Sequence, residues 1–230
     1  MDSISLYRPT VNEKKKFLAK TYMWMGVALL ISAAAALFTA SSEDMVRFLF
    51  GAGAKGFLIV ALAEIALVFV LSMAIRTISV FMASLMFIAY AVLNGITLSS
   101  IFFVYSLGSI AMCFFAAAAM FIFMSIYAMI TKQDLSKAGH YLMMGVLGII
   151  IASVVNMLLR SDSLSWLISI VTVVLFTGLT AYDTQKILRT AQRADSSDAY
   201  RKISIIGALE LYLDFINIFL SLLRLFGKRK

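Results

Sequence analysis

The sequence predicts an all-α integral membrane protein with seven transmembrane helices. Of its 230 residues, 62% are hydrophobic and only 14% are charged, and the mean hydropathy is +0.96. A soluble domain would carry roughly a quarter charged residues and about half apolar ones. The apolar residues also come in long runs, and about 20 of them suffice for a helix to cross the bilayer. Strands of a membrane barrel would instead be segments of ~10 residues with alternating character.

The chain divides into two basic tails and one membrane-embedded domain. We expect a basic cytoplasmic tail at 1–20, a seven-helix transmembrane domain at 21–226 and a basic C-terminal tail at 227–230. In chain order, the apolar runs that predict the helices are 22–40, 56–75, 80–103, 110–130, 141–159, 164–182 and 203–225. Residues 79–130 contain no charged residue and are too long for one helix, so we divide them at the turn-like segment 105–109.

The distribution of Lys and Arg predicts the orientation. With the N-terminus inside, thirteen of the 20 basic residues lie in inner segments and seven in outer ones, as the preference for positive charge in cytoplasmic loops requires. Seven crossings place the basic tail 227–230 outside, whereas a re-entrant last span or six crossings would return it inside. We prefer seven crossings. A cleaved signal peptide is the weaker interpretation of the first run, because 22–40 exceeds the usual apolar length.

Composition argues against several classes of function. The net charge of +8 resides in tails and loops rather than in a basic patch with interleaved aromatics, so no nucleic-acid partner is expected. The single Cys113 cannot form an intrachain disulfide. The only histidine, His140, has no cysteine or acidic cluster beside it in the sequence, and we expect neither an enzyme nor a bound cofactor.

Acidic side chains inside the apolar runs are the main candidates for function. Ionisable groups at membrane depth are costly unless paired or hydrated. Glu64 lies within the second run, Asp183 at the inner end of the sixth, and Asp214 near the middle of the last. The last run also carries a polar stripe at helical spacing, formed by Glu210, Asp214, Asn217, Ser221 and Arg224. This stripe is either a buried polar network that holds the bundle together or the lining of an ion pathway.

Asp183 and Asp214 would form a proton-sensitive site if the fold brings them together. Two carboxylates in a poorly hydrated site cannot both be ionised cheaply, so they titrate as one unit. Protonated, they would share a hydrogen and hold two helices together. Ionised, they would repel each other or recruit a hard cation such as calcium.

Four segments resemble the Bax inhibitor family (transmembrane Bax inhibitor motif proteins), and the bacterial branch most of all. They are FLAKTY at 17–22, NGITLSSIF at 94–102, AYDTQK at 181–186 and LYLDFIN at 211–217. The resemblance implies a seven-helix fold with the last helix central and surrounded by the other six. It also implies a pH-sensitive calcium leak controlled by an aspartate pair, which maps onto Asp183 and Asp214.

The resemblance also implies roles for residues outside the pair. An arginine at the inner end of the second helix favours closure by pairing with the first aspartate, and Arg76 is the candidate here. Glu64 matches an acidic position usual in the second helix. Glu210 matches no motif position and, with Glu64 and Asn217, is a candidate for lining a pore or contacting an ion.

Two functions follow as hypotheses. The first is a calcium (cation) leak channel gated by the buried aspartate pair, with calcium as the permeant ion and membrane lipids as its surroundings. The alternative is a regulatory membrane protein that binds and modulates a membrane-bound AAA protease through its basic N-terminal tail. The resemblance implies this function, because bacterial relatives are associated with modulating such a protease. The resemblance to the bacterial branch implies a bacterial inner membrane protein, and the distribution of Lys and Arg predicts a cytoplasmic N-terminus.

Overall fold

A computed structural model describes residues 11–51, 53, 55–75, 77–191 and 197–230. Its helices are α1 (Val11–Ser41), α2 (Glu43–Phe50), α3 (Lys55–Ala74), α4 (Val80–Leu98), α5 (Ile101–Val104), α6 (Leu107–Ile130), α7 (Ser136–Leu159), α8 (Asp162–Ala191) and α9 (Ser197–Phe226). Within these residues, seven helices are long and apolar enough to cross a membrane, α4 and α5 counting as one span. The predicted all-α membrane fold is therefore confirmed.

Several boundaries differ from the predicted ones. Helix α1 begins at Val11, so part of the expected tail is helical, and α8 continues to Ala191, eight residues beyond Asp183. Asp183 therefore lies inside a helix and not at its end. The charged residues of AYDTQKILRT hid this extension because they end the apolar run, although two of them, Lys186 and Arg189, are good helix formers.

Helix α2 is a short amphipathic helix that the apolar runs did not predict. Its N-cap residue is Ser42, whose side chain accepts a hydrogen bond from the backbone N–H of Met45, and Glu43 and Asp44 occupy its first turn. A side-chain acceptor and acidic residues at this position stabilise a helix N-terminus. Its buried Leu49 faces the bundle, so the connector between α1 and α3 is partly ordered.

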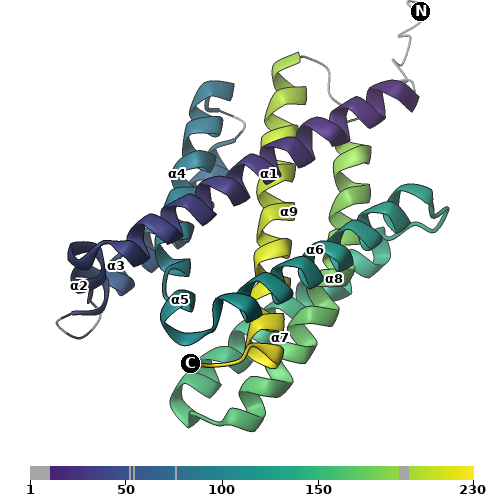
Figure 1. The fold of residues 1–230 in the computed structure, drawn as a ribbon. Coiled ribbons are helices and arrows are strands. Elements are labelled where there is room, and N and C mark those ends of the chain that lie inside the picture. The colour runs from purple at the N-terminus through teal and green to yellow at the C-terminus, as the bar shows by residue number, and fades with distance from the viewer. Residues whose placement is uncertain (1–10, 52, 54, 76, 192–196) are drawn as a thin grey trace, which may run out of the picture.

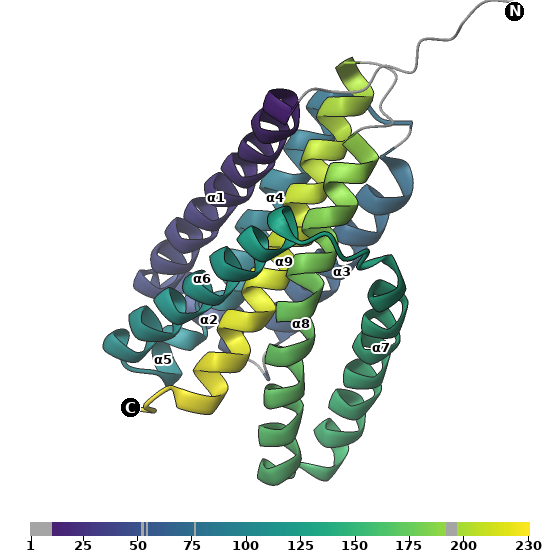
Figure 2. The same cartoon turned by 90° about the vertical axis from the view of Figure 1, so that its right-hand side faces the viewer.

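Helix α9 forms the interior of the bundle. It packs against α1, α4, α6 and α8, and 67% of its most apolar stretch is buried, compared with 0% for α7. Figures 1 and 2 show α9 between α4 and α8 in one view and between α1 and α8 in the other. Helices α3 and α7 pack mainly against α4 and α8 respectively. Four of the other six spans thus pack closely on α9.

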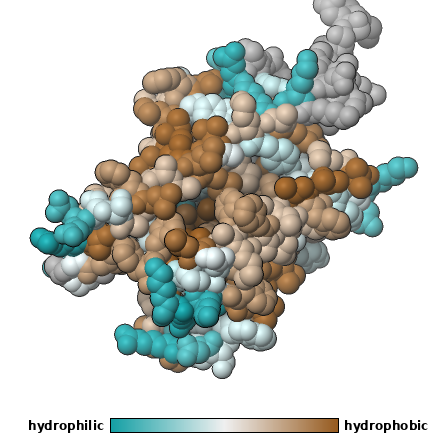
Figure 3. All heavy atoms as spheres, viewed as in Figure 1, coloured by the Kyte–Doolittle hydropathy of each residue, from teal (hydrophilic) through white to brown (hydrophobic). Residues whose placement is uncertain are grey.

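The outer surface of the bundle is apolar. Large hydrophobic side chains of α7 are exposed along the helix, among them Leu147 (62%), Ile151 (65%) and Leu158 (77%). Figure 3 shows hydrophobic residues over the middle of one face and hydrophilic residues at its margins. Such a surface would be unfavourable in water and suits contact with lipid chains.

The C-terminal residues are attached to the connector between α5 and α6. The backbone N–H of Lys230 donates to the carbonyl of Val104 (3.0 Å), and that of Ser106 donates to the carbonyl of Lys228 (3.0 Å). The chain's end therefore lies beside the connector that precedes the fourth span, at the opposite end of the bundle from the start of α1 (Figure 1). This is the arrangement that seven crossings require; which side faces the cytoplasm stays a prediction.

Candidate functional site

Four charged side chains from α8 and α9 form the centre of the candidate site. The two helices are sequential neighbours and pack along each other. The ammonium Nζ of Lys186 lies 2.6 Å from Oε1 of Glu210 and 3.6 Å from Oδ1 of Asp183. Lys186 and Asp183 are three residues apart and so share a helix face. The lysine thus bridges a carboxylate on its own helix and one on α9.

Asp214 completes this cluster from the interior of α9. Its side chain is almost fully buried, with the residue 3% exposed, and its Oδ2 has no hydrogen-bond partner among the described residues. It interacts electrostatically with Asp183, Glu210 and Lys186. The predicted pair therefore belongs to a group of three acids and one lysine, which we call the charge cluster (Asp183, Lys186, Glu210 and Asp214).

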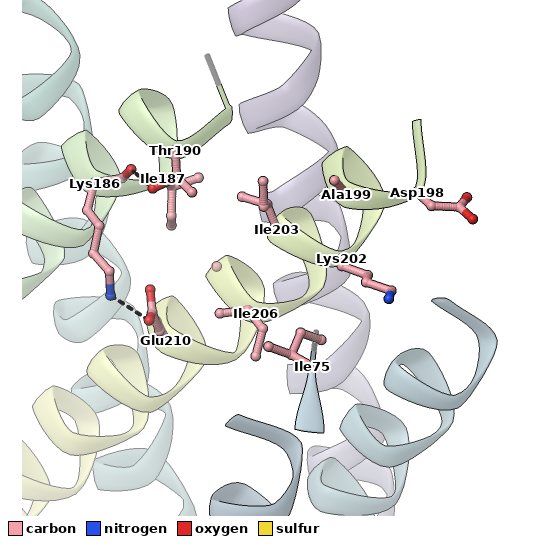
Figure 4. Close-up of a pocket in the computed structure, with 11 residues that line it drawn as sticks. Ile75, Lys186, Ile187, Thr190, Asp198, Ala199, Lys202, Ile203, Ile206 and Glu210 are labelled. Atoms are coloured by element: carbon pink, nitrogen blue, oxygen red, sulfur yellow. Dashed lines mark hydrogen bonds and ion pairs between the residues drawn. The ribbon is translucent and has the colours of Figure 1, made fainter. Parts of the chain in front are cut away.

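A cavity of about 510 Å³ adjoins the charge cluster (Figure 4). Its charged wall includes Lys186 and Glu210, and its apolar wall includes Ile75, Ile203 and Ile206. It lies between the end of α8 and the first half of α9. Arg76, the predicted gating partner, lies outside the described residues, although its neighbour Ile75 lines the cavity.

Beyond Asp214, the predicted polar stripe continues toward the other end of α9. The amide of Asn217 donates to the carbonyl of Leu213 on its own helix (2.8 Å). Ser221 is fully buried, and its hydroxyl has no partner within the described chain, while Arg224 is exposed. The stripe therefore faces protein from Asp214 to Ser221, and it carries polar atoms that the surrounding helices leave unpaired.

Glu64 belongs to a second network, on α3, α4, α9 and α1. Its Oε2 accepts a hydrogen bond from the amide of Asn94 (3.0 Å), and its Oε1 accepts one from the hydroxyl of Thr97. Tyr212 donates its hydroxyl hydrogen to Oδ1 of Asn94 (2.8 Å), and the Tyr212 oxygen lies 2.7 Å from Oγ of Ser32. The carboxylate predicted as an ion contact thus accepts hydrogen bonds from two side chains of α4.

Gln185, in the AYDTQK segment, attaches the α6–α7 connector to α8. Its Nε2 donates to the carbonyl of Gln133 (3.0 Å), and its Oε1 accepts from the backbone N–H of Leu135 (3.2 Å). In the same connector, Asp134 pairs with Arg189 (2.8 Å). The backbone N–H of Ser136, with help from Arg189, holds the pKa of Asp134 below its ordinary value.

Sequence reasoning missed Lys186, although a signal was present. A lysine three residues after a membrane aspartate can pair with it on one helix face, whereas the approach of Glu210 depends on how α9 packs. In the described part of the chain, no three His, Cys, Asp or Glu side chains are grouped closely enough to hold a metal ion. Calcium coordination by Asp183 and Asp214 therefore stays a prediction.

Comparison with known proteins gives matches over nearly the whole chain. A family model described as Bax1-I, inhibitor of apoptosis-promoting Bax1, matches residues 14–230. The chain is 46% identical over 217 residues to the inner membrane protein YbhL of Escherichia coli (strain K12), a match that covers 93% of this chain and 92% of that protein. It is 44% identical over 218 residues to an uncharacterized protein of Borreliella burgdorferi, with 94% of each covered.

Proposed function

The chain belongs to the Bax inhibitor family, and from that premise we propose that it is a pH-sensitive leak channel for calcium or another cation. The observation that carries the proposal is the charge cluster beside a 510 Å³ cavity, with a buried Asp214 whose Oδ2 has no partner among the described residues. An unpaired acid at membrane depth is costly. A passing cation would supply the missing charge. By the same family link we propose that the protein lies in a bacterial inner membrane, and the distribution of Lys and Arg supports an N-terminus in the cytoplasm.

The proposed pathway enters through the cavity and follows the polar stripe. A cation would pass Glu210 and Asp183, reach Asp214, and continue past Asn217 and Ser221. Carboxylate, amide and hydroxyl oxygens are the ligands that hard cations prefer. Asn217 accordingly contacts the ion, whereas Glu64 helps to hold α3 and α4 against α9.

The pH response follows from the charge of the acids. Asp183 faces Glu210 and Lys186, which itself interacts with Tyr182, and Asp214 faces Asp183, Glu210 and Lys186. Protonated carboxylates attract cations far less than ionised ones, and they can hold α8 and α9 together by sharing a hydrogen. The leak should therefore fall as the pH falls through the range in which the cluster takes up protons.

Calcium flux into proteoliposomes across a pH series tests this proposal. Asp183→Asn and Asp214→Asn should each lower the flux severalfold and flatten its pH response. Asp162→Asn is the matched control, because Asp162 is an exposed acid at the other end of α8, and it should leave both unchanged. Unchanged flux and pH response in both cluster variants would refute the proposal.

The alternative proposal is regulation of a membrane-bound AAA protease. The first half of the basic N-terminal tail, through which it would bind the protease, lies outside the described residues. Deleting residues 2–14 should abolish co-purification with a protease and leave calcium flux intact. A purified protein that conducts nothing and co-purifies with a protease through this tail would favour the alternative.

A further inference from the structure

The ammonium group of Lys186 occupies the position of a cation between two carboxylates. It lies 2.6 Å from Glu210 and 3.6 Å from Asp183, and these acids come from different helices. We propose that Lys186 is a tethered cation that competes with the permeant ion, and that an entering cation must displace it. This inference rests on the proposed leak pathway and adds the residue that limits its occupancy.

The exposure of the three side chains shows how the exchange would work. The Lys186 side chain is 43% exposed, whereas those of Asp183 and Glu210 are 11% and 28% exposed. The lysine side chain lines the cavity (Figure 4). Lysine carries a compact charge on a flexible stem, so its ammonium group has room to leave while the carboxylates remain in place.

When all three carboxyl groups of the charge cluster are ionised, they face a single ammonium group, and a divalent cation would balance their charge better than Lys186 does. Oδ2 of the buried Asp214 has no partner among the described residues. If a divalent cation replaced Lys186, Asp183 and Glu210 would supply oxygen ligands and Asp214 would add a further negative charge. Calcium accepts such carboxylate ligands in irregular geometry.

Two readouts on one set of variants test this inference. Thermal unfolding in detergent with added calcium reports occupancy of the site, and calcium flux in proteoliposomes reports conduction. Lys186→Met should lower the calcium concentration that gives a half-maximal rise in Tm by roughly fivefold, the factor expected for loss of one partly exposed competing ion pair. It should also raise the flux. Lys186→Arg, which keeps the charge, should behave nearly as the wild type does.

Lys202→Met is the matched control, because Lys202 lines the same cavity. If both methionine variants shift the calcium dependence equally, Lys186 acts only through the general charge of the cavity and the inference fails. The double variant Lys186→Met/Glu210→Gln should lose most of the increase in calcium affinity and flux that Lys186→Met produces, because it also removes one of the two carboxylates that Lys186 contacts.

The two proposals fail in different ways. If the wild type conducts but Lys186→Met changes neither the calcium dependence of the Tm nor the calcium flux, the inference is refuted and the leak proposal stands. If no variant conducts, the leak proposal is refuted. A calcium-dependent rise in Tm that strengthens in Lys186→Met would then still support Lys186 as the competitor at a cation-binding site.

Discussion

Removing one buried hydroxyl group tests whether the Glu64 network fixes α9 in the bundle. Tyr212 is fully buried, and its hydroxyl joins Asn94 of α4 to Ser32 of α1 at 2.8 and 2.7 Å. Tyr212→Phe keeps the ring, and with it the edge-on contacts to Phe87 and Tyr90. The substitution therefore removes two hydrogen bonds between helices and little else.

The expected loss of stability follows from the two hydrogen bonds. Side-chain hydrogen bonds between membrane helices contribute about 0.6 kcal/mol each on average, with a maximum of about 1.7 kcal/mol. The substitution also leaves the buried Oδ1 of Asn94 without its donor, which adds to the cost. We expect a total of about 1–2 kcal/mol. For a chain of this size, this corresponds to a decrease in Tm of roughly 2–8 °C.

The single cysteine provides the assay. Cys113 is 1% exposed, so a thiol-reactive fluorophore should label it only when the protein unfolds. Tyr90→Phe is the matched control, because Tyr90 is 5% exposed in the same cluster and its hydroxyl makes no hydrogen bond within the described residues. A decrease in Tm for Tyr212→Phe no larger than that for Tyr90→Phe would refute the reasoning.

Two further predictions concern packing and pH. Gly95→Ala should destabilise the protein by about 1–3 kcal/mol, because a Cβ atom there would lie 2.4 Å from the carbonyl oxygen of Ser32. Gly148→Ala, in open space, should be neutral or slightly stabilising in the same thermal assay. Because its partners hold the folded-state pKa of Asp134 below the ordinary value, the stability it contributes is present at neutral pH and lost as the pH falls through the folded pKa. The Tm difference between wild type and Asp134→Asn should therefore shrink in acid, and a constant difference would contradict this account.

The seven spans could be predicted from the sequence because lipid imposes a simple length and composition on each of them. The positions of the helix ends were predicted less accurately, since α8 continues through the charged residues after Asp183. Helix α2 was missed because eight residues between two spans give too short a pattern. Apolar character sets the length of a span, whereas capping residues such as Ser42 set where a short helix begins.

The candidate site followed from the sequence only in part, and the reason lies in helix geometry. The polar stripe on α9 predicted Glu210, Asp214 and Asn217 as site residues, because residues three or four positions apart lie on the same face of a helix. The pairing of acidic and basic side chains across the two helices depends on the register between α8 and α9. The residue pattern within a single helix does not determine that register. Lys186 was therefore visible as a neighbour of Asp183 but not as the partner of Glu210.

Helix α9 carries two polar networks on opposite faces, one that attaches it to α1 and α4 and one that faces α8. Tyr212 and Asp214 are two residues apart, and at 3.6 residues per turn their side chains point in directions about 160° apart. On one side, neutral hydrogen bonds join Tyr212 to α1 and α4. On the other, the buried carboxyl group of Asp214 interacts electrostatically with the α8 residues Asp183 and Lys186. Changes of protonation or of bound cation would therefore act between α9 and α8, while the opposite face of α9 stays attached. If the proposed leak is gated, the moving element should accordingly be α8, which carries Lys186 and, through Gln185, holds the α6–α7 connector.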